Sequence, residues 1–330
     1  MEELLKVESL KKYFPVKLGF FKSIVSRKQI FVKAVDQVSF LIHRQEIFGL
    51  AGESGSGKTT TGRLVLRLIE PTEGRVFFKG KDIFEIPEAN TKLLRRQMQM
   101  IFQDPYESLN PRFTVYDIIS EPLKIHKILS DDQQIEERVL KSLEEVKITP
   151  PEQFLFRYPH ELSGGQRQRV ALARSLILEP EFMVADEPVS MLDVSIRAEV
   201  LNLMFELIHK HNVSFLYITH DLALARHICD HIGIMYLGKI MEMSDAEKIV
   251  YEPLHPYTKA LIAAVPVPDP TARRSEAVIK GEIPSSINPP SGCRFHTRCP
   301  SYIGDVCRAK EPELMDVGGE HYVACHLYSK

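Results

Sequence analysis

The glycine-rich run Gly52–Thr59 constrains the fold of this chain more than any other sequence feature. Its sequence, GESGSGKT, satisfies the pattern G-x-x-x-x-G-K-[ST]. The run follows a short apolar segment, residues 46–51, that predicts a strand. It precedes a predicted helix from about Lys58 to Ile69, which Pro71 and Gly74 end. A strand, a glycine-rich turn and a helix in this order predict a phosphate-binding loop in an α/β fold.

The residue types in this loop suit the triphosphate of a nucleotide such as ATP. Glycines let backbone N–H groups turn inward around phosphate oxygens, and the helix N-terminus adds partial positive charge. Lys58 supplies a full charge to the β- and γ-phosphates, and the Thr59 hydroxyl is placed to coordinate Mg²⁺. A chance glycine-rich turn is the alternative, which the flanking strand and helix disfavour. The predicted ATP-binding residues here are Gly52, Glu53, Ser54, Gly55, Ser56, Gly57, Lys58, Thr59 and Thr60.

Two adjacent acids, Asp186 and Glu187, follow a second apolar segment that begins at Phe182. Ligands bind at the carboxyl ends of strands in open α/β sheets, so Asp186 is expected to hold Mg²⁺ through water. Glu187 is then placed to act as a general base on an attacking water. A strand ending in two solvated acids is the alternative, which a phosphate-binding loop earlier in the chain makes less favourable.

The segment Leu162–Gln166, LSGGQ, precedes RQRVALARSL, which has a strong helix pattern. Ser163 is a suitable helix N-cap, and two glycines expose backbone N–H groups, so this is a second helix start that could bind an anion. A capped helix without a ligand is the alternative. The run LSGGQRQR resembles the signature motif of ABC-transporter ATPases, which carries Ser163, Gly164, Gly165 and Gln166.

This resemblance implies roles for further residues. Gln103 in MIFQDP resembles the glutamine that touches Mg²⁺ and senses the γ-phosphate. His220 in YITHD resembles the histidine that contacts the γ-phosphate. The run from Ser190 to Asp193 resembles the loop at the dimer interface, with Met191 where alanine is usual.

Tyr13 in LKKYFPV resembles the aromatic residue whose ring stacks on adenine. Phe14 is adjacent, so either ring could serve. The resemblance also implies a head-to-tail dimer in which Ser163 serves the nucleotide of the partner.

The strand patterns at residues 4–10 and 31–42, and the strand–helix alternation after Phe182, agree with the fold that the resemblance implies. That fold is an α/β P-loop NTPase with a RecA-like core, an antiparallel β subdomain and a helical subdomain at about 105–165. We expect this ATPase domain to span residues 1–265. A Pro-rich linker is predicted at 266–292 and a Cys-rich C-terminal region at 293–330.

Three further stretches resemble the ATPases of oligopeptide/dipeptide importers: QDPYESLNPRFTV, HPYTKALIAAVP and PPSGCRFHTRCP. A basic insertion at 17–30 resembles the second of the two ATPase subunits in such importers. The implied partners are a second ABC ATPase subunit, with a homodimer also possible, two membrane permeases and, indirectly, an extracytoplasmic substrate-binding protein. The permeases are expected to dock near Gln103, over Tyr106 to Arg112. Import of nickel or another small solute stays open.

Net charge and hydropathy distinguish an importer ATPase from other classes of protein. A net charge of −2 and a single cassette disfavour an ABC ATPase that acts on nucleic acid. No apolar run reaches the roughly 18 residues of a membrane helix, and the N-terminus lacks a secretory pattern. We therefore expect a peripheral protein at the cytoplasmic face of the membrane, held there by its partners. Glu187 and His220 together disfavour a scaffold that binds ATP without turnover.

The C-terminal region holds a cysteine group: Cys293, Cys299, Cys307 and Cys325. Four thiolates suit a [4Fe–4S] cluster or Zn²⁺, and the wide spacing favours the cluster. The region also resembles a cluster-binding tail of some peptide-importer ATPases. Histidines at 296, 321 and 326 keep zinc open, and four unligated thiols are the third possibility. Cys229 is expected to be a small buried residue.

Overall fold

The computed structural model describes residues 2–16, 29–104, 109–264, 279 and 281–329. The chain divides into two compact units. The first unit contains residues 1–2, 43–46 and 85–217, and the second contains residues 3–42, 47–84 and 218–330. The predicted basic insertion lies almost wholly outside the described residues, as do residues 106–108 of the predicted docking surface Tyr106–Arg112 and much of the Pro-rich linker.

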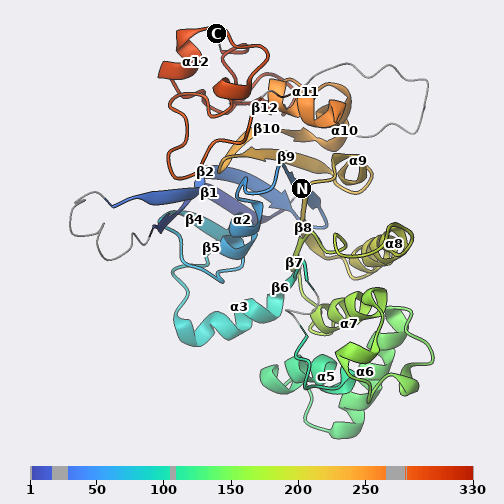
Figure 1. Cartoon of the computed structure of the whole chain (residues 1–330). Helices are drawn as coiled ribbons and strands as arrows, with labels where there is room; N and C mark the ends of the chain where they lie inside the picture. Colours follow the sequence, from blue (N-terminus) through green and yellow to red (C-terminus); the bar gives the residue numbers. More distant parts are fainter. Residues whose placement is uncertain (1, 17–28, 105–108, 265–278, 280, 330) are drawn as a thin grey trace, which may run out of the picture. The chain divides into compact units, whose positions relative to one another are not determined.

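The second unit contains an antiparallel sheet in the order β2-β1-β4-β5 (Figure 1). Its strands are β1 (Glu3–Pro15), β2 (Phe31–His43), β4 (Glu73–Phe78) and β5 (Lys81–Asp82). In β1 and β4, apolar side chains such as Leu5, Val7 and Val76 are buried, whereas polar neighbours face outward. Strands β1 and β2 confirm the two strands predicted from residues 4–10 and 31–42, and each is longer than expected.

The same unit contains the strand that leads into the phosphate-binding loop. This strand, β3 (Ile47–Ala51), is buried at every position and pairs in parallel with β9 (His231–Tyr236). On its other side, β9 pairs with the antiparallel strand β10 (Lys239–Asp245). Strand β10 pairs with β12 (Tyr322–Val323), which in turn pairs with β11 (Met315–Asp316). The helices are α2 (Lys58–Val65), α9 (Leu222–Ala225), α10 (Ala246–Tyr251), α11 (Pro256–Ala263), η4 (His296–Arg298) and α12 (Asp305–Ala309).

The first unit combines parallel strands with the helices expected at about 105–165. Strand β6 (Met98–Ile101) pairs in parallel with β7 (Phe182–Asp186). Strand β8 (Ser214–Thr219) is buried throughout, and all but its last two residues belong to this unit. The helices are η1 (Glu88–Asn90), α3 (Thr91–Gln97), α5 (Val115–His126), α6 (Asp132–Glu145), η2 (Pro151–Gln153), η3 (Pro159–Glu161), α7 (Gly164–Leu176) and α8 (Val194–Lys210).

One local prediction was wrong at a helix end. The helix predicted to reach Ile69 ends at Val65, because Arg67 has a φ of 50°, in the left-handed region, and this breaks the helix before Pro71. Helix α6 is capped by Asp131, whose side chain accepts a hydrogen bond from the Gln133 N–H at 3.2 Å. In the part of the chain that the structure describes, no helix is both long and apolar enough to span a bilayer.

Candidate functional site

The phosphate-binding loop lies in the second unit, between β3 and α2. Gly52 and Gly57 have φ angles of 150° and 107°, which side-chain-bearing residues rarely adopt. A Cβ at Gly52 would lie 2.2 Å from the Met235 carbonyl oxygen, and one at Gly57 would lie 2.2 Å from that of Ala34. The loop therefore needs glycine at both positions because its backbone runs against β9 and β2.

Lys58, the first residue of α2, is buried inside this loop. Its ammonium group donates to the carbonyl oxygens of Gly52 at 2.8 Å and Glu53 at 3.0 Å. The charge thus lies within the curve of the backbone, at the helix N-terminus, where an anion is favoured. This geometry fits the role that the sequence predicts for Lys58.

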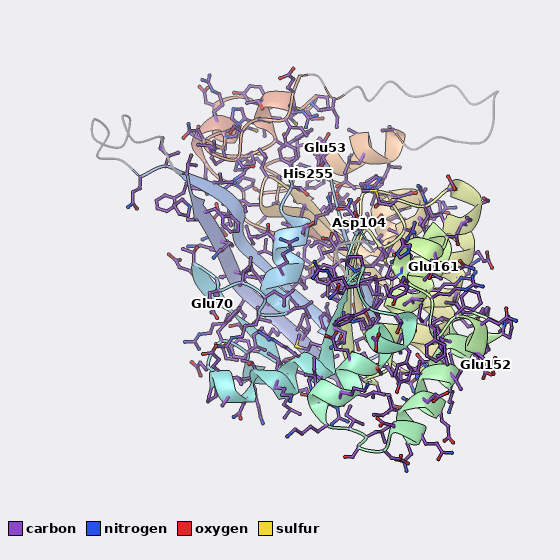
Figure 2. All side chains as sticks on the ribbon, turned by 60° about the horizontal axis from the view of Figure 1, so that its bottom comes forward. Glu53, Glu70, Asp104, Glu152, Glu161 and His255 are labelled. Atoms are coloured by element: carbon purple, nitrogen blue, oxygen red, sulfur yellow. The ribbon has the colours of Figure 1, made fainter. Side chains whose placement is uncertain are left out.

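Glu53, the second residue of the loop, is held through its backbone. Its N–H donates to the Tyr257 hydroxyl at 2.9 Å. Burial, ahead of the charge on Glu53, raises the pKa of Tyr257, so the hydroxyl stays protonated. Tyr257 belongs to α11, whose N-cap is His255; Figure 2 labels His255 and Glu53. In the sequence, HPYTKALIAAVP indicated only the family, because no local pattern links Tyr257 to Glu53, 204 positions away.

Tyr13, at the end of β1, is fixed by its hydroxyl group. The hydroxyl donates to Asp36 Oδ1 at 2.6 Å, and the Lys33 ammonium lies 5.5 Å from the ring centroid. Burial, followed by the Asp36 hydrogen bond, raises the pKa of Tyr13. Successive side chains of a strand point to opposite faces, so Tyr13 and the exposed Phe14 cannot both face one ligand. Asp36 was not singled out from the sequence.

The two acids follow strand β7 in the first unit. Asp186 is buried at the strand end, and Glu187 adopts a φ of 45°. A left-handed backbone at a glutamate is costly and is typical of functional positions. Gln103 Nε2 donates to the Glu187 carboxylate at 3.1 Å and lies 3.5 Å from Ser190 Oγ. The fold therefore brings together Gln103, Glu187 and Ser190, which the sequence places in three separate motifs.

Ser163 caps α7, as predicted, in a reciprocal capping box. Its hydroxyl accepts from the Gln166 N–H at 3.3 Å, and the Gln166 side chain accepts from the Ser163 N–H at 2.9 Å. Gly165 permits close helix packing, because a Cβ there would lie 2.7 Å from the Ile196 side chain of α8. The signature segment is thus a rigid, capped helix start in the first unit.

The remaining predicted residues lie at the ends of other elements. Asp193 is the N-cap residue of α8, and Met191 beside it is 65% exposed. His220 follows β8 and is exposed in the second unit. Tyr13, the phosphate-binding loop and His220 therefore belong to the second unit, whereas Gln103, the signature segment and both acids belong to the first.

The four tail cysteines lie in one region of the second unit. The Cys293 N–H donates to the Cys307 carbonyl oxygen at 2.9 Å. Burial, and to a smaller extent the charges of Cys325, Cys299 and Cys307, raise the pKa of Cys293 to about 12. Because these thiols interact electrostatically, they are close in space as well as in sequence.

The predicted metal sites of the tail are not supported by this arrangement. All five cysteines, each within the described residues, are free thiols. In the described part of the chain, no group of three or more His, Cys, Asp or Glu side chains could hold a metal ion. The three histidines that kept zinc open have other hydrogen-bond partners. His296 bonds to the Cys293 carbonyl, His321 to the Glu242 carboxylate and His326 to the Lys310 carbonyl. Cys229 is buried, as expected.

Comparison with known proteins identifies two family regions. Residues 35–190 match the ABC transporter family, and residues 241–307 match the oligopeptide/dipeptide transporter C-terminal region. The chain is 49% identical to the oligopeptide transport ATP-binding protein AppF of Bacillus subtilis, over 99% of this chain and 98% of AppF. It is 48% identical to the putative oligopeptide transport ATP-binding protein YkfD of the same organism, over 98% and 95%.

Solved structures show the same fold. The dimeric ATP-binding cassette MJ0796, bound to ADP and Pi after hydrolysis, matches with a TM-score of 0.63 and 26% identity, over 74% of this chain and 99% of that one. CbiO1 of Clostridium perfringens, part of the transporter complex cbiONQ, matches with a TM-score of 0.63 and 25% identity, over 76% and 92%. These matches confirm the predicted P-loop α/β fold.

Proposed function

The chain belongs to the ATP-binding subunits of oligopeptide ABC transporters, and from this premise we propose that it hydrolyses ATP to drive the import of oligopeptides or dipeptides. The observation that carries the proposal is the contact between Gln103 Nε2 and the Glu187 carboxylate at the end of β7. It links a residue proposed to sense the γ-phosphate to the residue proposed as general base. Both relatives are oligopeptide transport ATP-binding proteins by name, YkfD putatively, so import of nickel or another small solute gains no support from them.

Nucleotide binding is assigned to the second unit. The backbone N–H groups of residues 52–60 bind the phosphates, and the buried Lys58 ammonium compensates their charge. Tyr13 supplies the ring for adenine. His220 contacts the γ-phosphate.

Hydrolysis depends on Glu187. Its carboxylate takes a proton from the attacking water while the water oxygen bonds to the γ-phosphorus and the bond to the bridging oxygen of ADP breaks. Gln103, hydrogen-bonded to Glu187, orients that carboxylate. The products are ADP and phosphate.

Mg²⁺ is the metal that this chemistry requires, and the donors fit it. Thr59, Asp186 and Gln103 each offer an oxygen ligand, which a hard cation prefers. The ion would neutralise charge that develops on the β- and γ-phosphates. Asp186 holds its place because it ends the buried strand β7.

Pairing of two cassettes completes the site in this proposal. The capped segment Ser163–Gln166 provides N–H groups for the nucleotide of the partner, which is a second ATPase subunit or a second copy. Asp193 and the exposed Met191 lie in the loop assigned to this interface. ATP would hold the dimer closed and hydrolysis would release it. Two permeases would keep the dimer peripheral, at the cytoplasmic face of the membrane.

The four tail cysteines support a separate proposal, that they hold a [4Fe–4S] cluster. The donor chemistry fits, because such clusters are bound by four cysteine thiolates. Among the described residues no group of side chains is arranged to hold a metal ion, so the proposal rests on the donor set alone. The cluster would tie together the segments of the tail that carry the four cysteines.

Reconstitution tests the transport function. The chain, its permeases and the second ATPase subunit are placed in vesicles with the matching binding protein, and uptake of labelled peptide is measured with ATP. We expect uptake that needs ATP and disappears when this chain carries Lys58→Ala. Uptake of Ni²⁺ but not of peptide would replace the proposed substrate, and peptide uptake without this chain would overturn its role.

A further inference from the structure

The cysteine-flanked segment Cys293–Cys299, CRFHTRC, places two arginine side chains inside the second unit. Arg294 is 4% exposed and Arg298 is 9% exposed. A buried charge is costly unless it is paired and hydrogen-bonded, so each arginine needs an acidic or carbonyl partner inside the unit. Arg298 contacts Glu53 of the phosphate-binding loop, and Arg294 contacts Asp36, which binds Tyr13.

Arg298 reaches the phosphate-binding loop. Its two terminal nitrogens donate to the two oxygens of the Glu53 carboxylate, at 2.7 and 3.2 Å, and one of them also lies 3.3 Å from the Tyr236 hydroxyl. This forked geometry is the strong form of an arginine–carboxylate pair. Hydrogen bonding to Glu53 is the main cause that raises the pKa of Arg298, so its charge is constant. Glu53 is thereby held at its side chain by Arg298 and at its N–H by Tyr257.

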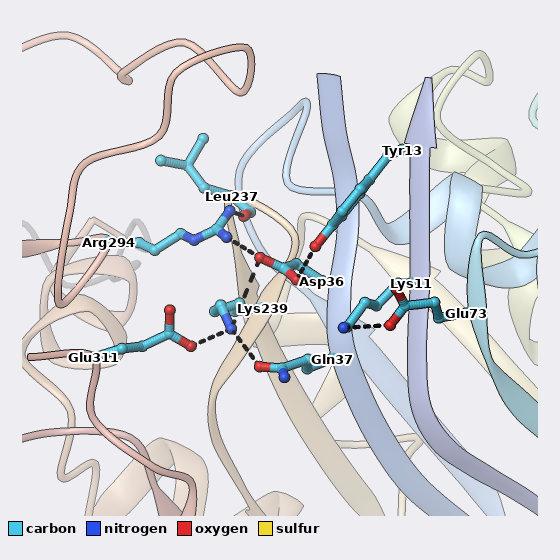
Figure 3. Close-up of polar contacts among 9 residues, drawn as sticks. All are labelled: Lys11, Tyr13, Asp36, Gln37, Glu73, Leu237, Lys239, Arg294 and Glu311. Carbon is cyan, nitrogen blue, oxygen red and sulfur yellow. Dashed lines mark hydrogen bonds and ion pairs between the residues drawn. The ribbon is translucent and has the colours of Figure 1, made fainter. Parts of the chain in front are cut away.

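Arg294 contacts Asp36, which binds Tyr13, the residue proposed to stack on adenine (Figure 3). One terminal nitrogen donates to the Leu237 carbonyl at 2.5 Å, and the other bonds to Asp36 Oδ2. The second oxygen of Asp36 accepts the Tyr13 hydroxyl at 2.6 Å. Burial alone would raise the pKa of Asp36, but the Tyr13 hydrogen bond and the charges of Lys239 and Arg294 lower it, so Asp36 is ionised.

The turn after β9 joins these two contacts. Gly238 follows Leu237; its carbonyl accepts from the Asp36 N–H at 2.8 Å, and its N–H donates to the Ser56 carbonyl of the phosphate-binding loop, also at 2.8 Å. Arg294 therefore bonds to a turn that contacts both Asp36 and the loop. Hydrogen bonds therefore connect the tail segment both to the phosphate-binding loop and to Tyr13.

Phe295 fixes the segment between its two arginines. The side chain is fully buried, and its ring lies 5.4 Å from the ring of Tyr236 and 5.2 Å from that of Tyr257. Aromatic packing of this kind holds a short irregular segment in one position. The arginines are consequently presented at fixed points while the segment is folded.

We propose that Arg294 and Arg298 are positioning residues for ATP, so that nucleotide affinity depends on the folded state of the cysteine segment. Arg298 positions the phosphate-binding loop through Glu53, and Arg294 positions the Tyr13 ring through Asp36. The inference rests on the proposed roles of the loop and of Tyr13. Anything that unfolds the segment between Cys293 and Cys299 would weaken ATP binding at both points.

The test compares ATP with inorganic tripolyphosphate, which has no adenine. Dissociation constants are measured by competition with a fluorescent ATP analogue, using the full chain with Mg²⁺. Arg298→Gln is expected to weaken both ligands about tenfold, which lies within the usual range for coupled sites. Arg294→Gln is expected to weaken ATP by a similar factor and tripolyphosphate by less than about twofold. Arg308→Gln is the matched control, because this exposed arginine also adjoins a tail cysteine.

Rescue separates positioning from loss of folding. Arg298→Lys and Arg294→Lys keep a charge but lose the fork, so each should bind ATP with an affinity between those of the wild type and the glutamine variant. If a glutamine variant does not fold, the ATP affinity of the corresponding lysine variant is compared with that of the wild type instead. Unchanged ATP binding in both arginine variants would overturn the inference, as would equal weakening of both ligands by both variants. A wild-type chain that binds no ATP would instead overturn the proposed function.

Discussion

Gln103 Nε2 lies 3.1 Å from the Glu187 carboxylate, although the two residues are separated by 84 positions in the chain. The hydrogen bond joins a glutamine that follows β6 to a glutamate that follows β7. These strands are parallel neighbours, so their carboxyl ends lie at the same edge of the sheet. The pairing thus explains how residues of two motifs meet at one edge of the sheet.

Replacing the proposed base should separate ATP binding from turnover. Glu187→Gln keeps a hydrogen-bond acceptor for Gln103 but cannot take a proton, so the turnover rate should fall by about 10²-fold or more. ATP affinity should change little, and an ATP-bound dimer should accumulate in size-exclusion chromatography. Glu152→Gln, at an exposed glutamate of the same unit (Figure 2), is the control. Wild-type turnover in Glu187→Gln would exclude this role.

Blocking the signature segment should prevent dimerisation without affecting the nucleotide site of the same chain. Ser163→Arg removes the cap of α7 and places a long side chain where the phosphate of the partner is expected. ATP affinity of the monomer should stay within about twofold, whereas dimer formation is lost and turnover falls at least about tenfold. Ser130→Arg, at an exposed serine before α6, serves as the control. If Ser163→Arg dimerises normally with ATP, the segment does not contact the partner nucleotide.

His255 should make stability depend on pH. Burial, and secondarily the charge of Lys259, lowers the pKa of His255 to about 3, and its Nδ1 accepts from the Tyr257 N–H at 3.0 Å. Below an unfolded pKa of about 6.5, the unfolded chain binds a proton that the folded chain does not. The contribution of His255 to the free energy of unfolding is therefore complete above about pH 6.5 and is lost as pH falls toward 3. By pH 5 it has fallen by about 2 kcal/mol.

Chemical unfolding at several pH values measures this effect. Urea titrations of the wild type and of His255→Asn, which keeps an acceptor for the Tyr257 N–H, are compared between pH 7 and pH 5. The wild type should lose more free energy of unfolding than the variant over this range. Parallel pH profiles for the two proteins would show that His255 titrates alike in the folded and unfolded states.

Metal analysis decides the state of the tail cysteines. Anaerobically purified protein should be brown and contain iron and acid-labile sulfide if the four thiols hold a cluster. Cys307→Ser should lose the iron and become more sensitive to protease, whereas Cys229→Ser should keep it, because Cys229 is buried beside Gly49 of β3 and is not one of the four tail cysteines. Colourless protein with one equivalent of zinc would establish the alternative ion, and metal-free protein would leave four unligated thiols.

Local sequence patterns determined much of this protein because they act over a few residues. Glycines at 52 and 57 are required by the backbone of the loop, and Ser163 caps its helix through a residue three positions away. Alternating burial specified β1 and β2 in the same way. Such features follow from backbone conformation and neighbouring hydrogen bonds, so the phosphate-binding loop, the signature segment and the acids after β7 could all be predicted.

Only the tertiary structure decided which distant side chains meet. Arg298 and Glu53 are 245 positions apart, and Arg294 and Asp36 are 258 apart. An arginine carries no local signal for its partner, because the pair depends on strand order and on the packing of Phe295 against Tyr236 and Tyr257. In the sequence, CRFHTRC identified a family and a set of thiols. The fold made the same segment a support for the nucleotide-binding loop, since the paired strands β3 and β9 bring the loop and the tail to one place.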